Sequence, residues 1–134
     1  MEEDIVIGRH VYGNLYDVSE DRVFTDEEYV RNLVIEAAKV ANAKLLAVHS
    51  WKVGGKKGGI SVLALVVESH IAVHSWTEYR YVTVDIYTCG EEADPWKAFN
   101  YILNALKPKD YIVHYADRSS KKTIKSSEVK QSSS

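Results

Sequence analysis

Two stretches of the chain carry apolar residues at the spacing of an amphipathic helix. The first spans residues 26–41, where Thr25 and Glu28 form the pattern of a capping box. The second begins at Asp94-Pro95, a cap followed by proline at the first helical position. Its expected buried stripe is Trp96, Phe99, Leu103 and Leu106, and Pro108 ends it.

Strand patterns fill most of the remaining chain. Polar and apolar residues alternate over residues 82–88, as in a half-buried strand. Strands are also expected over residues 5–16, 45–53, 60–68, 71–76 and 111–115. Tight connections between strands favour antiparallel pairing. The order of elements predicts an α+β fold, a two-layer α/β sandwich with helices on one face of a mostly antiparallel sheet.

Composition narrows the class of protein. The chain has 134 residues, of which 46% are hydrophobic and 27% charged, with a net charge of −2. These values predict one globular domain over residues 1–117 and argue against nucleic acid or a membrane as partner. The acidic start and the single cysteine favour a cytoplasmic protein without an internal disulfide. Residues 118–134, rich in serine and lysine, are expected to be a disordered tail.

A glycine- and lysine-rich segment, residues 54–59, precedes the central strands. It lacks the Gly-Lys-Ser/Thr ending of a phosphate-binding loop, and no helical pattern follows it. A flexible hairpin connection is the favoured interpretation.

The stretch from Glu68 to Trp76 holds the most suggestive chemistry. If the backbone there is strained, the Ser69 hydroxyl can attack the Glu68 carbonyl and convert the amide into an ester. Elimination and hydrolysis then leave a pyruvoyl group, an electrophile that can form a Schiff base with a substrate amine. Judged by residue chemistry alone, an ordinary serine at a strand end is the simpler interpretation.

Five other residues have more than one interpretation. His70 and His74 fall on one side of a strand and could be structural, metal-binding or proton-carrying residues, although no third metal ligand is evident. Cys89, at a strand end, is either a small buried residue or a proton donor. Trp76 could stack on a substrate and Glu78 could bind it, or they could be a core tryptophan and a solvated glutamate.

Taken together, these residues resemble the small prokaryotic S-adenosylmethionine decarboxylases. The resemblance covers roughly residues 5–117. It is carried by the following motifs: Gly8-Arg9-His10, Ser61, Glu68-Ser69-His70, His74-Ser75-Trp76-Thr77-Glu78, Asp85-Ile86-Tyr87-Thr88-Cys89-Gly90 and Asp94-Pro95-Trp96-Lys97-Ala98-Phe99. The resemblance implies a pyruvoyl-dependent decarboxylase of polyamine biosynthesis that is made as a proenzyme.

By this resemblance, the chain cuts itself between Glu68 and Ser69. Residues 1–68 become the β chain and residues 69–134 the α chain, whose first residue is the pyruvoyl group. The resemblance implies no metal, and it implies that the processed protomers pair into a homodimer.

The resemblance also assigns roles to individual side chains. Ser61 and His74 match residues of self-processing, with His74 moving the proton. Cys89 matches the proton donor in decarboxylation, and Glu78 a substrate-binding carboxylate, with Trp76 beside it.

Two substrates fit the family, because a crenarchaeal branch resembling it decarboxylates arginine instead of S-adenosylmethionine. The position of the adenine-stacking aromatic falls near Val53 here, with Trp51 as a possible substitute. Asp17 stands where many members have glycine, and Asp17 or Glu78 could bind a guanidinium group. We therefore expect arginine to be the substrate, with S-adenosylmethionine as the alternative.

Two hypotheses from other classes stay open. One is a non-catalytic α/β module that binds a small molecule and leaves Ser69 uncut. The other is a metal-dependent enzyme that uses His70, His74 and Cys89.

Overall fold

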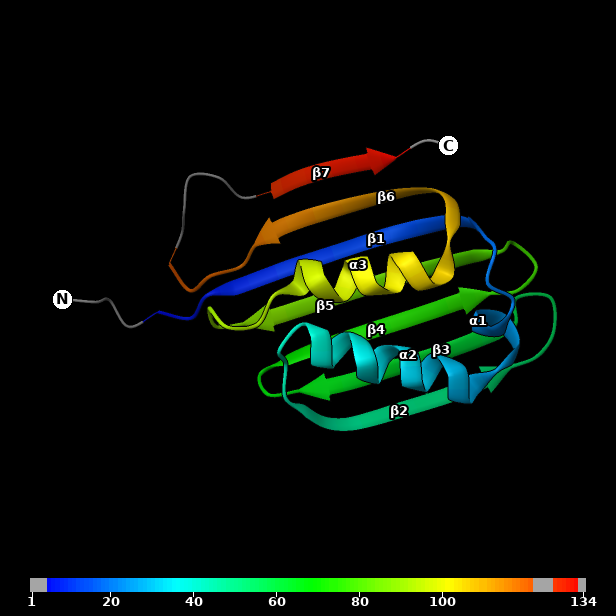
Figure 1. Ribbon diagram of the computed structural model, residues 1–134, viewed down its shortest axis with the longest axis horizontal. Helices are drawn as coiled ribbons and strands as arrows, with labels where there is room; N and C mark the ends of the chain where they lie inside the picture. The colour runs from blue at the N-terminus through cyan, green and yellow to red at the C-terminus, as the bar shows by residue number, and fades with distance from the viewer. Residues whose placement is uncertain (1–4, 122–126, 133–134) are drawn as a thin grey trace.

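A computed structural model describes residues 5–121 and 127–132 of the protein (Figure 1). Its elements, in chain order, are β1 (Gly8–Val18), α1 (Arg22–Thr25), α2 (Glu27–Val40), β2 (Leu45–Val53), β3 (Gly59–Val66), β4 (Ser69–Trp76), β5 (Tyr81–Cys89), α3 (Pro95–Leu106), β6 (Pro108–Asp117) and β7 (Ser127–Ser132). The strands form one sheet in the order β2-β3-β4-β5-β1-β6-β7. Every neighbouring pair is antiparallel.

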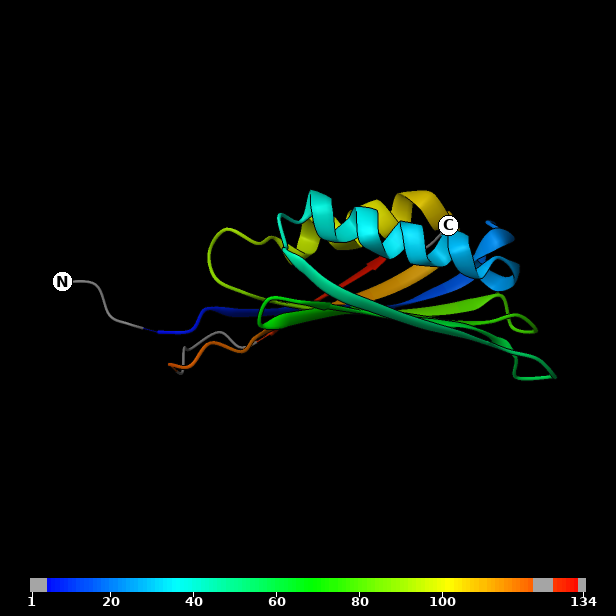
Figure 2. The same ribbon diagram turned by 90° about the horizontal axis from the view of Figure 1, so that it is seen from below.

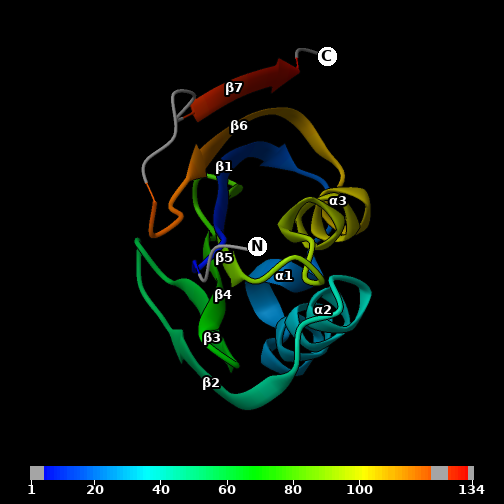
Figure 3. The ribbon, with the colours of Figure 1, turned by 90° about the vertical axis from the view of Figure 1, so that its left-hand side faces the viewer.

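The helices lie on one face of this sheet (Figure 2). The end-on view shows α2 and α3 side by side against that face, with the sheet curving around them (Figure 3). The α+β two-layer architecture expected from the sequence is confirmed. None of the helices in the described part of the chain covers the opposite face, which we call the open face.

The core fills the space between the helices and the sheet. Strand residues of one parity are buried there, as shown by Val82, Val84 and Ile86 of β5. From α3 the core receives Ala98, Phe99, Ile102 and Leu106. Trp96 and Leu103, expected in the buried stripe, are only partly buried and pack against the edge of this core.

The cap predicted for α3 is confirmed, and the cap predicted for α2 is not. The Asp94 carboxylate accepts a hydrogen bond from the Trp96 amide, and Pro95 occupies the first helical position, as expected. The capping box at Thr25 is wrong, because Thr25 ends α1 and Asp26 caps α2 by accepting from the Tyr29 amide. Aspartate caps at least as well as threonine, so the true start lies one residue later.

The start of β3 requires a glycine. A Cβ atom at Gly59 would overlap the Ser75 carbonyl oxygen of β4, far inside contact distance. The buried Ser75 hydroxyl accepts from the Ile60 amide and donates to the Val23 carbonyl, joining β3, β4 and α1. This packing fixes how the strands that hold the site are placed relative to the helical layer.

The C-terminal segment departs from the expectation of disorder. Ser127–Ser132 forms β7, which pairs with β6 in antiparallel register from Tyr111 to Ala116. An edge strand presents unpaired backbone groups, and a further segment can pair with these through its own backbone. Residues 122–126 and 133–134 of the expected tail lie outside the described residues.

Among the described residues, no helix has the length and apolar character needed to cross a membrane.

Candidate active site

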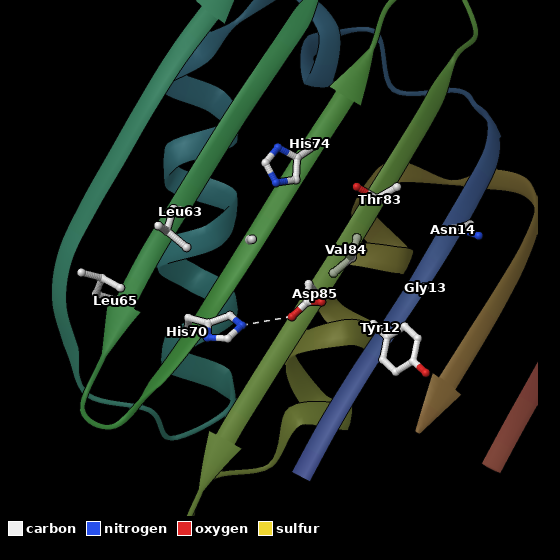
Figure 4. A pocket seen from close by; sticks show the side chains of 11 residues that line it. Tyr12, Gly13, Asn14, Leu63, Leu65, His70, His74, Thr83, Val84 and Asp85 are labelled. Carbon is white, nitrogen blue, oxygen red and sulfur yellow. Dashed lines mark hydrogen bonds and ion pairs between the residues drawn. The ribbon is translucent and has the colours of Figure 1, made fainter. Parts of the chain in front are cut away.

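The open face bears a hollow of about 570 Å³ over the central strands. Its walls include His70 and His74 of β4, Asp85 of β5 and Tyr12 of β1, all of which Figure 4 shows on one side of the sheet. Both histidines therefore lie on the same face, as the period of a strand predicts.

The bond expected to be cut lies in a tight turn next to this hollow. Val66 pairs with Ser69 across the β3–β4 hairpin, so only Val67 and Glu68 connect the strands. Glu68 has a φ of 58°, in the left-handed region. A side chain with a Cβ atom is unfavourable there by about 1–2 kcal/mol. The turn thus holds strain on the residue that would supply the scissile carbonyl.

Cys89 approaches this turn from the end of β5. Its amide donates a hydrogen bond to the Ser69 hydroxyl oxygen across 2.9 Å. Its thiol donates to the Glu68 carbonyl oxygen across 3.1 Å. Cys89 is half-buried, so the thiol is not part of the core. The structure therefore brings together the three residues that the sequence placed at the cut and in proton donation.

Between the two ends of the open face lies a hydrogen-bonded trio of side chains to which the sequence assigned no role. The Asp85 carboxylate lies 2.9 Å from His10 Nε2 and 3.1 Å from His70 Nε2. Burial alone would raise the pKa of Asp85, but hydrogen bonds from His70 and His10 outweigh it and lower that pKa. The trio joins β1, β4 and β5 at the centre of the face.

Ser61 and His74 form a separate pair. His74 Nδ1 lies 2.8 Å from the Ser61 hydroxyl, across the β3–β4 ladder. Ser69 and His74 stand five residues apart on one extended strand, which separates them by roughly 16 Å. His74 and Ser69 therefore do not meet within one protomer.

Trp76 and Glu78 are not on one face of a strand, because β4 ends at Trp76. Glu78 lies exposed in the following turn. Trp76 packs against Tyr81 with ring centroids 5.4 Å apart, and Tyr81 stacks on Tyr16 at 5.5 Å. This aromatic row continues from the Ser61–His74 pair, since the His74 and Trp76 rings are 6.3 Å apart.

The residues weighed for substrate choice lie at the borders of the sheet. Trp51 and Val53 of β2 are 49% and 52% exposed. Asp17 lines a small hollow together with Arg80 and Lys109. Two neighbouring cations make this carboxylate a poor site for a guanidinium group, so Glu78 is the better candidate of the two.

The sequence reasoning passed over Tyr87, although it precedes Cys89 by two residues on the same strand face. Its hydroxyl lies 3.4 Å from the Cys89 sulfur. The strand period could have indicated this contact, because residues two apart on a strand share a face.

The described residues do not form the ligand cluster that a metal-dependent enzyme would need. Within the described residues, no three His, Cys, Asp or Glu side chains are grouped to hold a metal ion. His70, His74 and Cys89 are spread along the open face, since His74 pairs with Thr83, six residues before Cys89.

The fold is thus an antiparallel sheet with helices on one face, and its candidate site is a strained Glu68–Ser69 turn beside Cys89. The S-adenosylmethionine decarboxylase family model matches residues 9–119, and the chain belongs to this family.

Three curated relatives are each named arginine decarboxylase proenzyme. The protein from Hyperthermus butylicus is 59% identical over 117 residues, covering 87% of this chain and 82% of the relative. The protein from Aeropyrum pernix is 57% identical over 122 residues, covering 91% and 92%. The protein from Ignicoccus hospitalis is 59% identical over 120 residues, covering 90% and 83%.

A solved structure has the same fold. The crystal structure of the adenosylmethionine decarboxylase from Aquifex aeolicus matches with a TM-score of 0.76 and 30% identity. The match covers 90% of this chain and 97% of that one.

Proposed function

We propose that this chain is a self-processing, pyruvoyl-dependent decarboxylase that converts arginine to agmatine and carbon dioxide. One observation carries the proposal: the Glu68–Ser69 bond lies in a left-handed turn with the Cys89 thiol on its carbonyl oxygen. Strain, a fixed hydroxyl and a hydrogen-bond donor on the carbonyl are what an acyl shift needs.

In the proposed cleavage, the Ser69 oxygen attacks the Glu68 carbonyl carbon, and the carbon–nitrogen bond breaks as the ester forms. The Cys89 thiol stabilises the negative charge that develops on the carbonyl oxygen, from its position 3.1 Å away. The Cys89 amide holds the Ser69 oxygen in place from 2.9 Å. The hydroxyl proton of Ser69 moves to the amine nitrogen freed in this step. Loss of the Cα hydrogen of residue 69 then expels the Glu68 carboxylate as the end of the β chain and leaves a dehydroalanine, which water converts into the pyruvoyl group with release of ammonia.

The sheet explains how two chains would remain one protein. Six residue pairs join β3 to β4, from Ser61–His74 to Val66–Ser69. The cut would open only the hairpin turn and leave this ladder intact. After cleavage, β1 of the β chain also stays between β5 and β6 of the α chain.

The residues around Ser69 fit a pyruvoyl group formed there, because its neighbours are polar and within reach of the serine oxygen. When present, this group serves as an electron sink for loss of carbon dioxide. The Cys89 thiol, at the same strand end, can supply the proton that replaces the carboxylate.

The active site is proposed to be shared between two protomers. His74 cannot reach Ser69 of its own chain, so its role in cleavage requires a second copy. Two open faces packed about a twofold axis would bring Ser69 of one chain toward the Ser61–His74 pair of the other. Apolar exposure supports such packing, since Leu65 is 40% and Tyr12 36% exposed on this face.

Arginine is preferred as substrate because three relatives at 57–59% identity are named arginine decarboxylase proenzyme. Arginine also suits the aromatic row and Glu78, because a guanidinium group stacks on rings and pairs with carboxylates. S-adenosylmethionine is the second candidate, supported by the family model and by the Aquifex aeolicus structure.

The test combines mass with activity. Purified protein is expected to show two chains of roughly half of 15.2 kDa each, and to release carbon dioxide from arginine but not from S-adenosylmethionine. Release from S-adenosylmethionine alone would replace the substrate while keeping the chemistry. A folded sample that stays at 15.2 kDa and decarboxylates neither would instead support a non-catalytic binding module.

A further inference from the structure

Tyr87 stands at the centre of the contacts around Cys89. It lies on β5 between His10 of β1 and His70 of β4, its partners in the two neighbouring ladders. Its hydroxyl oxygen is 3.4 Å from the Cys89 sulfur, within hydrogen-bond distance for sulfur. Tyr87 therefore contacts the thiol directly. It can influence the Glu68–Ser69 bond only through that thiol.

The number of available hydrogen atoms determines which group donates the hydrogen bond between Tyr87 and Cys89. The thiol has a single hydrogen, and it has two oxygen neighbours, Glu68 O at 3.1 Å and Tyr87 Oη at 3.4 Å. The Glu68 carbonyl can only accept, whereas the phenol can also donate. Both contacts are satisfied when Tyr87 donates to the sulfur and the sulfur donates to Glu68.

The glycine at position 8 leaves room for the phenol oxygen of Tyr87. Gly8 of β1 pairs with Cys89, so a side chain at position 8 would point toward this cluster. A Cβ atom there would lie 2.8 Å from Tyr87 Oη and 2.6 Å from the Arg118 carbonyl oxygen. Glycine at this position thus allows the hydroxyl of Tyr87 to reach the thiol.

A hydrogen bond and burial keep the phenol of Tyr87 protonated. The pKa of Tyr87 is raised, first by its hydrogen bond with Cys89, then by burial and by the negative charge of Glu68. The positive charge of Arg118, whose guanidinium lies 5.0 Å above the ring, lowers the pKa of Tyr87. The rings of His10 and His70 flank Tyr87 at 6.2 and 5.9 Å. At neutral pH the phenol is therefore a hydrogen-bond donor.

We propose that Tyr87 is a positioning residue, which through its hydroxyl holds the Cys89 thiol on the Glu68 carbonyl and stabilises the thiolate form of that sulfur. Its consequence for cleavage rests on the self-processing proposed above, but its effect on the thiol does not. The two effects can therefore be measured separately.

The first measurement uses uncut protein. Cys89 is the single cysteine of the chain, so alkylation by iodoacetamide reports on this thiol alone. The rate is measured against pH for Ser69→Ala and for the double variant Ser69→Ala/Tyr87→Phe. Tyr101→Phe in the same background is the control, because it removes a hydroxyl from an exposed side chain of α3, in the helical layer and not on the open face.

Loss of the donor is expected to move the alkylation profile of the Tyr87→Phe variant to higher pH. The rate at neutral pH should fall by about three- to tenfold, while the plateau at high pH stays the same. The profile of the Tyr101→Phe variant should match that of Ser69→Ala. Profiles that coincide, or that differ by one factor at every pH, would overturn the proposal, because a change in access alone acts equally at all pH values.

The second measurement follows self-cleavage with Ser69 intact. Tyr87→Phe should cut at least about threefold more slowly than the parent and the Tyr101→Phe control, with unchanged far-ultraviolet circular dichroism. Cutting at the parental rate would overturn the positioning role. If the parent itself never cuts, the self-processing proposal fails, and the alkylation profiles still decide the contact between Tyr87 and Cys89.

Discussion

The thiol of Cys89 lies on the carbonyl oxygen of Glu68, although 21 residues separate them in sequence. Two strand ends produce this contact: β5 ends at Cys89 and the β3–β4 turn ends at Glu68. The proposed cleavage site and the proposed proton donor are thereby parts of one cluster. The same sulfur atom can act first on the scissile carbonyl and later on the product.

Cys89→Ala should slow self-cleavage by at least about tenfold, because the donor to the developing oxyanion is lost. Cys89→Ser should cut faster than Cys89→Ala, since a hydroxyl also donates. The fraction of cut chain over time, measured by intact mass, gives both rates. Decarboxylation by the cut Cys89→Ala protein should be slow, and a fully active cut variant would refute the role in proton donation.

Ser69→Ala should leave one chain of 15.2 kDa without decarboxylase activity, because alanine has no nucleophile for the acyl shift. Ser19→Ala is the control, since Ser19 is exposed and lies in the segment after β1. Mass spectrometry distinguishes the two. A cut Ser69→Ala chain would place the reaction at another residue.

Strain at Glu68 predicts an effect of glycine at this position. Glu68→Gly removes the Cβ atom that makes a φ of 58° unfavourable, so the uncut turn should become more stable. If about 1 kcal/mol of that strain is released during cleavage, the cut should slow by about fivefold. Glu68→Gln keeps the strain but removes the charge, and it should cut at nearly the parental rate. Equal rates for the glycine and glutamine variants would show that strain does not contribute.

The alternation of side chains along the strands predicts part of this site, and the register between the strands determines the rest. Alternation in residues 81–89 places Cys89 and Tyr87 on one face, and the Glu68-Ser69 motif marks the turn. The left-handed Glu68 and the Cys89 contact depend on the register between two hairpins, which pattern alone does not fix. Ser127–Ser132 was missed because its pairing uses backbone groups of an edge strand.

The Asp85 trio predicts an acid-sensitive contribution to stability. The folded-state pKa of Asp85 lies below its ordinary 3.8, so its contribution is present above that pH and is lost as the pH falls through the lowered value. The effect should be modest, because the Asp85 side chain is 43% exposed and solvent screens it. Asp85→Asn should be less stable than the parent at pH 5, and this difference should shrink toward pH 2. Urea unfolding at several pH values measures it, with exposed Glu92→Gln as control; a pH-independent difference would contradict it.

The separation of Ser69 from His74 makes complementation the decisive test of a shared site. His74→Ala and Ser69→Ala proenzymes should each stay uncut when produced alone. In a mixed dimer, Ser69 of the first chain meets His74 of the second, so one of the two sites is complete. Co-expression should therefore cut only the His74→Ala chain, and the mass change of the His74→Ala substitution, found in the fragment from residue 69 onward, identifies it. A Ser69→Ala/His74→Ala partner should give no rescue. If co-expression leaves both chains whole while the parent cuts, His74 does not act across the dimer.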